Sequence, residues 1–357
     1  MARKRPTAKK KLRMAFIGAG GIAGTHMRYL AEMDDVALVA LADISEDAMA
    51  RRAEEFGIDA AFTDYRKMLR EVKPDAVSVC TPNGMHARAS IAASTAGADV
   101  LVEKPMAMNA REAQGMIAAA KKSRRKLVIG FQHRYDPRTQ FVRNAVEAGQ
   151  LGKVVYARVQ ALRRRGIPNW GVFGRKDLQG GGPLIDIGVH ALEMTHYAMG
   201  SPRPVAASGS TFTYLGDRKS NVVSQWPNWD HKTYTVEDLA VGQIRFDNGA
   251  VLSVESSFVA HIKSGAMGFT LMGEKGGASW DPPEIFRDDA GYMVDAKPNW
   301  LPGGRAADCF AVKMRNFVDH VLHGEPTGAP AEHGLMVQKM LDGIYTSAEK
   351  GREVAIK

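Results

Sequence analysis

The feature that most restricts the fold is a glycine-rich turn between an apolar strand and a helix near the start of the chain. Residues 14–17 form an apolar run, the turn Gly18-Ala19-Gly20 interrupts it, and residues 22–31 carry a helical apolar pattern. A second apolar run over residues 36–42 ends in Asp43. Strand, turn, helix, strand and acid in this order predict a βαβ unit that binds a dinucleotide.

Each position of the turn has a physical role in that prediction. Gly18 permits a tight turn, and Gly20 lets backbone amides approach a pyrophosphate. Gly21 and Ile22 begin the helix, whose N-terminus offers unpaired N–H groups and a partial positive charge to the phosphates. Ala23 is the third small residue, where helix and strand pack closely. The alternative is an ordinary glycine turn that binds nothing.

The acid at the end of the second strand favours NAD over NADP. The Asp43 carboxylate would accept hydrogen bonds from ribose hydroxyls and repel a 2′-phosphate. No basic residue follows at positions 44–46 to reverse this preference. We therefore expect NAD as the cofactor.

The composition is that of a globular protein with room for two domains. Of the 357 residues, 45% are apolar and 24% are charged. No run of about eighteen apolar residues occurs, so no membrane span is expected. Cys80 and Cys309 are too few and too far apart for a disulfide framework or a cysteine-based zinc site, and no metal is expected.

The positive charge is concentrated at the start of the chain. Seven of the nine net positive charges lie in the first 13 residues, where no acid occurs, so the rest carries a net +2. A nearly neutral body lacks the charge that nucleic acid requires, and none is expected as a partner. Residues 1–11 should form a solvated, disordered tail, the alternative being a tail that touches phosphates. Since the tail lacks the apolar region and cleavage site of a secretory signal, we expect a cytoplasmic protein.

Strands alternate with helices in the first part of the chain. The patterns predict strands near residues 60–62, 76–80, 100–102 and 127–130, and helices near 46–56, 65–72, 85–96 and 110–123. Ser45 and Asn109 should cap the first and the last of these helices. The alternation predicts a doubly wound parallel sheet, and with it a dinucleotide-binding domain over residues 12–135.

Polar segments follow the strands of this predicted sheet. Because ligands of such sheets lie at the carboxyl ends of the strands, these segments should meet at one site. Beyond the glycine turn and Asp43, the residues expected to contact the cofactor there are Thr81, Pro82, Asn83, His86, Glu103, Lys104, Gln132 and Arg134. His86, in the first turn of its helix, either lines the cofactor cleft or only packs there.

The pattern changes after Pro137. We expect helices near residues 138–148, 183–199, 307–322 and 332–350, and strands near 154–163, 205–214, 236–246, 250–259, 267–273 and 276–280. The strands read as antiparallel, with Asp247-Asn248-Gly249 as a hairpin turn. Residues 164–182 are expected to be irregular, and residues 226–234 and 281–305 to be long loops. Residues 136–357 are thus predicted to form a second, α+β domain.

Lys104 is the first candidate for chemistry. It lies between Glu103 and Pro105 at the end of a buried strand, beside the expected position of a nicotinamide. Partial desolvation suits a lysine there to acid–base work. The alternative is a surface lysine on a strand–helix loop.

Asp186 and His190 form the second candidate group. They are four residues apart in a predicted helix and therefore share one face, among apolar neighbours that should bury the helix. A buried carboxylate and imidazole suit the removal of a proton from a substrate hydroxyl. The alternatives are a capping aspartate with a core histidine, or a metal site completed by Glu193 or His196, whose spacing matches no known metal signature.

Other polar and aromatic residues have two interpretations each. Arg134, at the domain junction, either anchors a substrate or pairs with an acid. The run Arg163-Arg164-Arg165 either binds an anionic substrate or has one face solvated and the other paired. The expected loops carry tryptophans that either pack against a sugar ring or pack the loops themselves: Trp226, Trp229 and Trp300.

Five segments form an ordered set: residues 18–23, Thr81-Pro82-Asn83 with His86, Glu103-Lys104-Pro105, residues 130–135, and residues 181–190. In this order they resemble the motifs of the Gfo/Idh/MocA family of sugar and inositol oxidoreductases. The resemblance covers the chain after the tail. It implies an N-terminal Rossmann domain and a C-terminal domain with an open, mostly antiparallel sheet, through which a homodimer or homotetramer would form.

The same resemblance implies a function. Lys104, Asp186 and His190 correspond to the family's catalytic lysine, aspartate and histidine, in an NAD-dependent oxidoreductase of a sugar, cyclitol or related polyol. His190 would take the hydroxyl proton and Lys104 would stabilise the oxygen, while Asp186 would orient a neighbouring hydroxyl or the histidine. Further substrate contacts are expected from Arg134, Arg163 and Trp170.

Two alternatives to this function remain open. One is an NAD-dependent glycoside-cleaving enzyme that acts by transient oxidation and elimination, and the other is a non-catalytic NAD-binding sensor. The chain departs from the family pattern at Gln132-His133, where the family varies, and at Pro183, where a small residue is usual. Trp170 and residues 215–235 match no family motif, and we expect substrate specificity to lie there.

Overall fold

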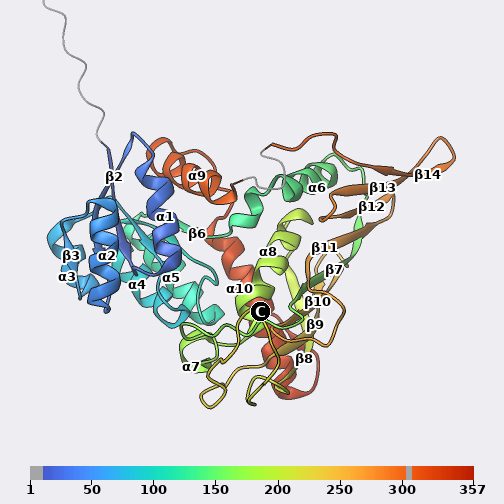
Figure 1. The fold of residues 1–357 in the computed structure, drawn as a ribbon. Coiled ribbons are helices and arrows are strands. Elements are labelled where there is room, and N and C mark those ends of the chain that lie inside the picture. Colours follow the sequence, from blue (N-terminus) through green and yellow to red (C-terminus); the bar gives the residue numbers. More distant parts are fainter. Residues whose placement is uncertain (1–10, 303–307) are drawn as a thin grey trace, which may run out of the picture.

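Two sheets lie side by side and are bridged by helices from the end of the chain (Figure 1). The computed structural model describes residues 11–302 and 308–357. Apart from Lys11, the expected disordered tail therefore lies outside the described residues, and so does the expected start of a helix at residue 307. In the described ranges, every helix is either too short or too polar to cross a membrane.

The first sheet is the predicted Rossmann sheet, with six parallel strands in the order β3-β2-β1-β4-β5-β6. The order reverses between β1 and β4, so the loops that follow these strands run apart and open a crevice at the carboxyl edge. The strands are β1 (Leu12–Ile17), β2 (Val36–Ala42), β3 (Ala61–Phe62), β4 (Ala76–Val79), β5 (Asp99–Val102) and β6 (Leu127–Ile129). The helices are α1 (Gly21–Ala31), α2 (Glu46–Phe56), α3 (Tyr65–Val72), α4 (Asn83–Thr95) and α5 (Ala110–Ser123).

Local sequence signals set the ends of these elements. The Ser45 side chain accepts a hydrogen bond from the Ala48 N–H at 3.3 Å, and the Asn109 side chain accepts one from the Glu112 N–H at 3.0 Å, so both predicted caps are confirmed. Gly18 has a φ of +101°, and a Cβ there would lie 2.5 Å from the Cys80 carbonyl oxygen. Only glycine can therefore make this turn.

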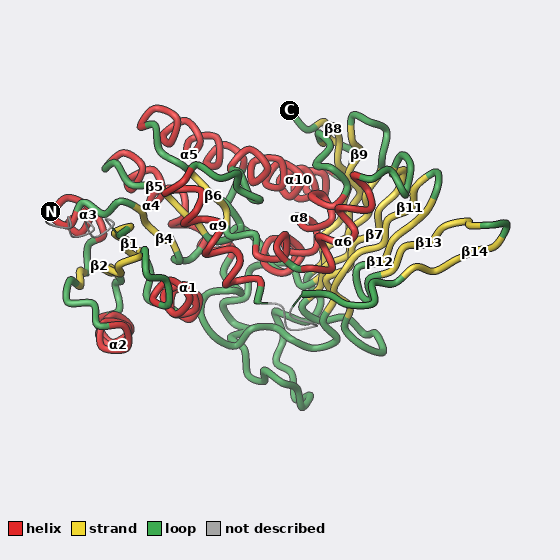
Figure 2. The backbone as a smooth tube through the Cα atoms, turned by 90° about the horizontal axis from the view of Figure 1, so that it is seen from above, coloured by secondary structure: helices red, strands yellow, loops and turns green. Residues whose placement is uncertain are grey.

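The second sheet has nine strands in the order β14-β13-β12-β11-β7-β10-β9-β8-β15. Its strands are antiparallel except for β7 and β10, which run parallel at the centre, so the predicted mostly antiparallel sheet is confirmed. Helices α6, α8 and α10 lie over one face and leave the other open (Figure 2). The strands are β7 (Val154–Leu162), β8 (Pro204–Phe212), β9 (Leu239–Phe246), β10 (Val251–Ser257), β11 (Ala266–Gly273), β12 (Gly276–Ser279), β13 (Glu284–Asp289), β14 (Tyr292–Ala296) and β15 (Val354–Ala355). The helices are α6 (Pro137–Glu147), α7 (Lys176–Gln179), α8 (Val189–Ala198), α9 (Cys309–His323) and α10 (Ala331–Lys350), with a 3₁₀ turn over Gln132–Tyr135 and a π turn over Leu184–Gly188.

Some predictions for this half were wrong. The expected loop over residues 281–305 contains the hairpin β13–β14, which projects from the end of the sheet and turns at Ala290 and Gly291 with φ of +50° and +83°. Its strands contain apolar residues, but these follow no regular alternation, and Tyr292 and Met293 are 75% and 91% exposed, so the sequence lacked the pattern of a strand with one buried face. The predicted helix over residues 183–199 starts as a π turn rather than an α-helix. The strand β15 and the short helix α7 were not predicted.

A buried ion pair joins the first sheet to the end of the chain. Lys313 of α9 places its Nζ 2.7 Å from Glu103 Oε1 and 3.0 Å from His26 Nε2, and all three side chains are buried. Burial disfavours the charged carboxylate, but the Lys313 ammonium and His26 hold the pKa of Glu103 well below its ordinary value. Burial, together with the same ammonium, lowers the pKa of His26 to about 4, so this ring is neutral.

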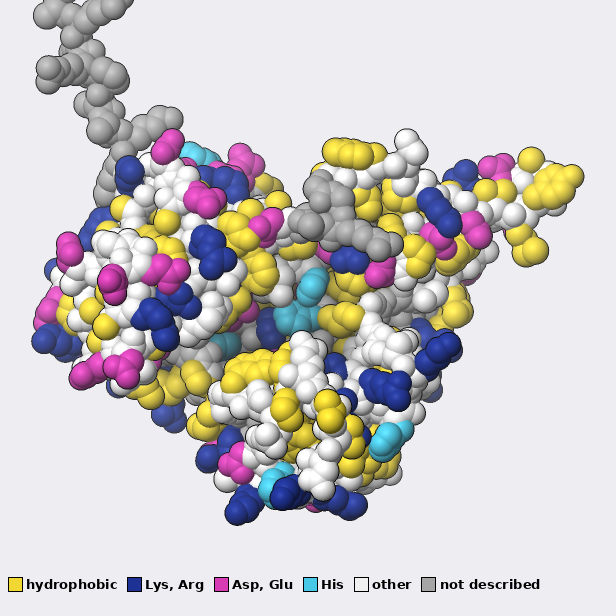
Figure 3. Space-filling view, in the orientation of Figure 1, with side chains coloured by type: hydrophobic (Ala, Val, Ile, Leu, Met, Phe, Trp, Pro, Cys, Tyr) yellow, Lys and Arg dark blue, Asp and Glu magenta, His cyan; other side chains and the backbone are white. Residues whose placement is uncertain are grey.

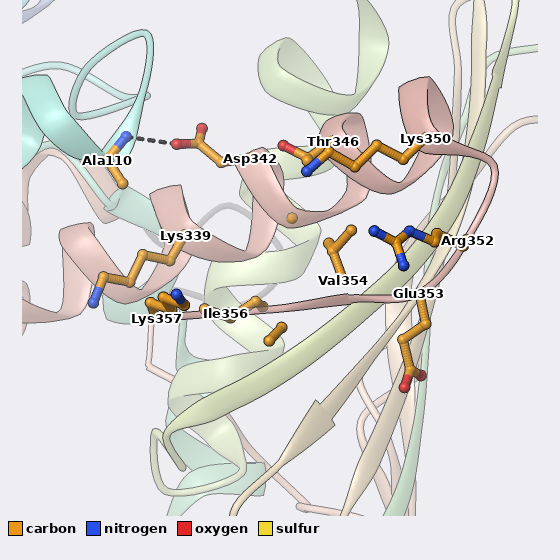
Figure 4. Close-up of a pocket in the computed structure, with 12 residues that line it drawn as sticks. Ala110, Lys339, Asp342, Thr346, Lys350, Arg352, Glu353, Val354, Ile356 and Lys357 are labelled. Carbon is orange, nitrogen blue, oxygen red and sulfur yellow. Dashed lines mark hydrogen bonds between the residues drawn. The ribbon is translucent and has the colours of Figure 1, made fainter.

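A second link between the halves lies near the C-terminus. The Ala110 N–H at the start of α5 donates to Asp342 Oδ2 of α10 at 2.6 Å (Figure 4). Beside this bond, between α10 and β15, is a hollow of about 440 Å³ whose wall includes Lys339 and Arg352. Helix α10 thus spans both halves.

Replacing Lys313 by methionine should lower the free energy of unfolding by about 3–5 kcal/mol, because it leaves a carboxylate buried without its cation. Urea unfolding at neutral pH measures the change. Lys121→Met is the matched control, since Lys121 of α5 pairs with Glu332 of α10 where both side chains are exposed. This control should cost less than about 1 kcal/mol. Equal losses for the two variants would contradict the role given to Lys313.

Candidate active site

A cavity of about 590 Å³ lies between the two halves, with His133 of the first half and a larger set from the second half on its wall. Asp186 and His190 line it together with Arg163 and Trp170. The space-filling view shows histidine side chains in the hollow between the halves (Figure 3). The Asp186 carboxylate and the His190 imidazole, both predicted to take part in the chemistry, therefore face the same space.

Lys104 contacts Asp186, which lines this cavity. Its Nζ donates to the Asp186 backbone carbonyl at 2.8 Å and to the carboxylate Oδ1 at 3.2 Å. The two side chains are 16% and 15% exposed. Lys104 follows β5 of the first sheet, whereas Asp186 lies in the π turn before α8. The sequence placed these residues in separate candidate groups, and the fold joins them into one.

His190 begins α8 beside this pair. Its ring lies edge-on to His133 with the ring centres 5.0 Å apart. Its Nδ1 is buried and has no hydrogen-bond partner in the described part of the chain. Burial, and then the charges of Lys104 and His133, hold the pKa of His190 well below its ordinary value. The imidazole is therefore neutral at physiological pH and able to accept a proton.

The carboxyl edge of the first sheet fits a dinucleotide. Helix α1 begins directly after Gly20, and a Cβ at Gly20 or Gly21 would meet no atom within 4 Å, so the backbone at the start of the helix borders open space. At the same edge, Thr81 Oγ1 and Gln132 Oε1 are buried without a hydrogen-bond partner among the described residues. Amides free for phosphate and two polar groups that lack partners are what a bound dinucleotide would satisfy.

Asp43 holds the glycine turn from the end of β2. Its Oδ2 accepts from the Ala19 N–H at 2.6 Å, and its Oδ1 accepts from the Ser45 N–H at 2.8 Å. The carboxylate is therefore positioned next to the turn, where a ribose would lie in this fold.

Other predicted cofactor residues have their side chains engaged within the protein. The Glu103 carboxylate belongs to the buried pair with Lys313, so only its backbone reaches the edge. The His86 ring nitrogens lie 2.8 Å from the Pro105 carbonyl and 2.9 Å from the Thr81 carbonyl. This histidine packs under the loops that follow β4 and β5.

Arg134 pairs with an acid. Its side chain is completely buried, with Nε 2.7 Å from Glu193 Oε2 and the guanidinium over the Phe131 ring. The Arg134 side chain is thus engaged within the protein, and the substrate and cofactor contacts expected of it stay predictions. The metal alternative lacks support, because Glu193 is taken by Arg134 and the described residues contain no group of three possible ligands.

Glu237 is a residue whose importance the sequence analysis missed. Its buried carboxylate accepts from the Gly182 N–H at 2.9 Å, the Leu184 N–H at 3.3 Å and the Tyr345 hydroxyl at 2.8 Å. It thus caps the turn that carries Asp186 into the cavity. The signal available beforehand was only a glutamate close to an apolar strand, which is common.

Aromatic side chains form the rim of the cavity. Trp170 is 48% exposed and lies edge-on to Trp226, with the ring centres 4.7 Å apart. The Arg163 guanidinium lies over the Trp226 ring at 4.9 Å. Trp229, in contrast, is buried and donates from Nε1 to the Gly216 carbonyl at 2.8 Å, so it packs its own loop.

Two family profiles match the chain. The first describes an oxidoreductase family with an NAD-binding Rossmann fold and matches residues 12–131. The second describes the C-terminal alpha/beta domain of the same oxidoreductase family and matches residues 143–356. Together they cover most of the described structure.

Characterised relatives span nearly the whole chain. A D-glucoside 3-dehydrogenase of Escherichia coli (strain K12) is 38% identical over 97% of each chain. A myo-inositol 2-dehydrogenase of Thermotoga maritima is 27% identical over 97% of this chain and 99% of the relative. Among solved structures, an aldose-aldose oxidoreductase from Caulobacter crescentus in complex with glycerol is 25% identical, with a TM-score of 0.80 over 97% of this chain and 100% of that one. A levoglucosan dehydrogenase in complex with NADH shares the fold, with a TM-score of 0.85 at 23% identity over 98% of this chain and 100% of that one.

Glu237→Ala should lower the free energy of unfolding by about 2–3 kcal/mol, because it leaves three donors without an acceptor. Glu237→Gln keeps one carbonyl oxygen as an acceptor and should lose less than half of that. Urea unfolding of both variants provides the measurement. An equal loss for glutamine and alanine would show that the carboxyl group acts by filling space rather than by capping.

Proposed function

The chain belongs to the Gfo/Idh/MocA family of oxidoreductases, and we propose that it uses NAD to oxidise a ring hydroxyl of a sugar, cyclitol or related polyol, or to reduce the corresponding ketone. The observation that carries the proposal is that Asp186 and His190 line one cavity between the two halves and that Lys104, at the end of β5, contacts Asp186. The relatives named for a glucoside and an inositol support a ring polyol as substrate.

The residues of the chain divide the work at the reacting carbon. Bound NAD supplies the hydride acceptor, and the α1 amides and Asp43 are the groups that would hold it. His190, neutral at physiological pH, takes the proton of the hydroxyl on the carbon being oxidised. Lys104 donates a hydrogen bond to the same oxygen and stabilises its developing negative charge. Asp186 fixes the Lys104 ammonium and has a second carboxylate oxygen for a neighbouring hydroxyl.

The rest of the cavity suits a sugar ring. The aromatic ring of Trp170 offers an apolar face for ring C–H groups, and Arg163 offers N–H donors to ring hydroxyls. A cavity of about 590 Å³ has room for a ring with a substituent. We propose both residues as substrate contacts.

Lys104→Ala and His190→Ala should each lower kcat by about 10²–10⁴-fold while leaving the affinity for NAD nearly unchanged. Because the pKa of His190 is lowered, kcat/KM should stay level from pH 8 down to about pH 6 and fall only on further acidification. His190→Asn should remove that acid limb. Lys121→Ala, an exposed lysine on α5, is the matched control and should keep full activity. Unchanged turnover in either alanine variant would refute the assignment.

One assay separates the three functions left open by the sequence. Monosaccharides, inositols and glycosides are supplied with added NAD, and NADH absorbance is followed together with product release. NADH that rises in step with product identifies a dehydrogenase. Glycoside cleavage without net NADH identifies the elimination mechanism, and bound NAD with no turnover of any compound identifies a sensor.

We also propose that the chain forms a homodimer or homotetramer through the open face of the nine-stranded sheet. This face lacks helices (Figure 2). Two large apolar side chains of its strands, Phe212 and Met272, are 48% and 45% exposed. Contact with a second copy would bury them.

Met272→Asp should therefore shift the mass measured by light scattering toward the monomer. The control Val312→Asp removes an equally exposed apolar side chain from α9, away from the sheet, and should leave the mass unchanged. A monomeric wild-type protein would contradict the proposal.

A further inference from the structure

Three consecutive arginines, residues 163–165, directly follow β7. Arg163 donates to the Gly166 carbonyl at 2.9 Å, and Arg164 donates to the Lys263 carbonyl at 3.0 Å. Arg165 Nη1 is buried and has no hydrogen-bond partner in the described ranges. Within those ranges none of the three forms an ion pair with a carboxylate. Adjacent guanidinium groups repel one another, so an anion bound between them would reduce this repulsion.

A hollow of about 430 Å³ lies against this run. It is lined by Arg164, Arg165, His261 and residues 222–225, and its lining contains no carboxylate. Ser224 of this lining has a buried Oγ without a hydrogen-bond partner among the described residues. The hollow therefore combines positive charge with two polar groups that lack partners, a combination that an oxyanion would satisfy.

This hollow lies close to the candidate active-site cavity, since Arg163 of the cavity lining directly precedes Arg164 of the hollow. Trp226 directly follows the residues 222–225 that line the hollow. Its ring lies 4.7 Å from the Trp170 ring and under the Arg163 guanidinium at 4.9 Å, and both of these residues line the cavity. Trp226 thus lies next to residues of both spaces, and a substrate with one ring in the cavity would pass Trp226 to reach the hollow.

We propose that the hollow is an oxyanion subsite, and that the substrate is a glycoside whose aglycone or second ring carries a carboxylate, sulfate or phosphate. Arg164 and Arg165 bind the anion, and Ser224 donates a hydrogen bond to it after rotation of its side chain. The inference rests on the proposed function, because it places the ring that is oxidised in the candidate cavity. Beyond the proposed function, the inference specifies that the group attached to that ring carries a negative charge.

A matched pair of compounds tests the subsite. The 4-carboxyphenyl and 4-carbamoylphenyl glucosides, in both anomeric forms, have nearly the same shape and differ in charge. The carboxylate should have a kcat/KM about 10–100-fold higher than the amide, in the range expected for charge-assisted hydrogen bonds. Arg165→Gln should bring the ratio close to one without changing kcat/KM for the amide. Arg218→Gln is the control and should keep the wild-type ratio. Arg218 is exposed, lies in the same loop as residues 222–225 and pairs with Asp217.

Two further arms separate the possible failures. Inorganic phosphate should compete with the carboxylate compound but not with methyl glucoside. If phosphate binds while the wild type shows no preference for the carboxylate compound, the hollow binds a free anion rather than a group of the substrate, and the proposal is overturned. Calorimetric binding of both compounds in the presence of NAD is measured beside turnover. A preference in binding without NADH formation keeps the subsite and refutes the proposed function, and a ratio of one in both assays overturns the subsite.

Discussion

The buried ion pair between Glu103 and Lys313 is the interaction on which the geometry of the site depends. Glu103 directly precedes Lys104, so its carboxylate fixes the backbone from which the lysine reaches Asp186. The same carboxylate fills the space beside Gly130, where a Cβ would lie 2.5 Å from Oε1, and so sets the end of β6 as well. Removing either partner leaves a buried charge uncompensated, which the interior of a protein tolerates poorly.

In the second half of the chain, another buried carboxylate, that of Glu237, fixes the backbone next to a site residue. Glu237 caps the turn that carries Asp186, and its neighbour Asp238 accepts from the Leu215 and Gly216 N–H groups at 2.7 Å each. Two consecutive acids thus hold a turn of the candidate active site and the loop that leads toward Trp226. The site is assembled by groups that do not line its cavity.

Much of the first half was predictable because its signals are local. Strand length, glycine turns and side-chain caps act within a few residues, and they gave the Rossmann sheet and its carboxyl edge. The partners of Arg134, Glu103 and Glu237 were not predictable, because each lies at least 50 residues away in the sequence. A buried acid or arginine looks the same in the sequence as an exposed one. The hairpin β13–β14 was missed for another reason, because its apolar residues do not alternate with polar ones as they do in a strand that buries one face.

The return of α9 and α10 to the first sheet has a consequence for synthesis on the ribosome. The first sheet is complete at β6, yet the lysine that neutralises its buried carboxylate emerges more than 180 residues later. Until then Glu103 lacks this cation, and we expect the nascent Rossmann half to be less stable around it. In a chain that stops before Lys313, the Glu103 carboxylate has no cation beside it. We expect such a chain to unfold more readily there and to be degraded by proteases.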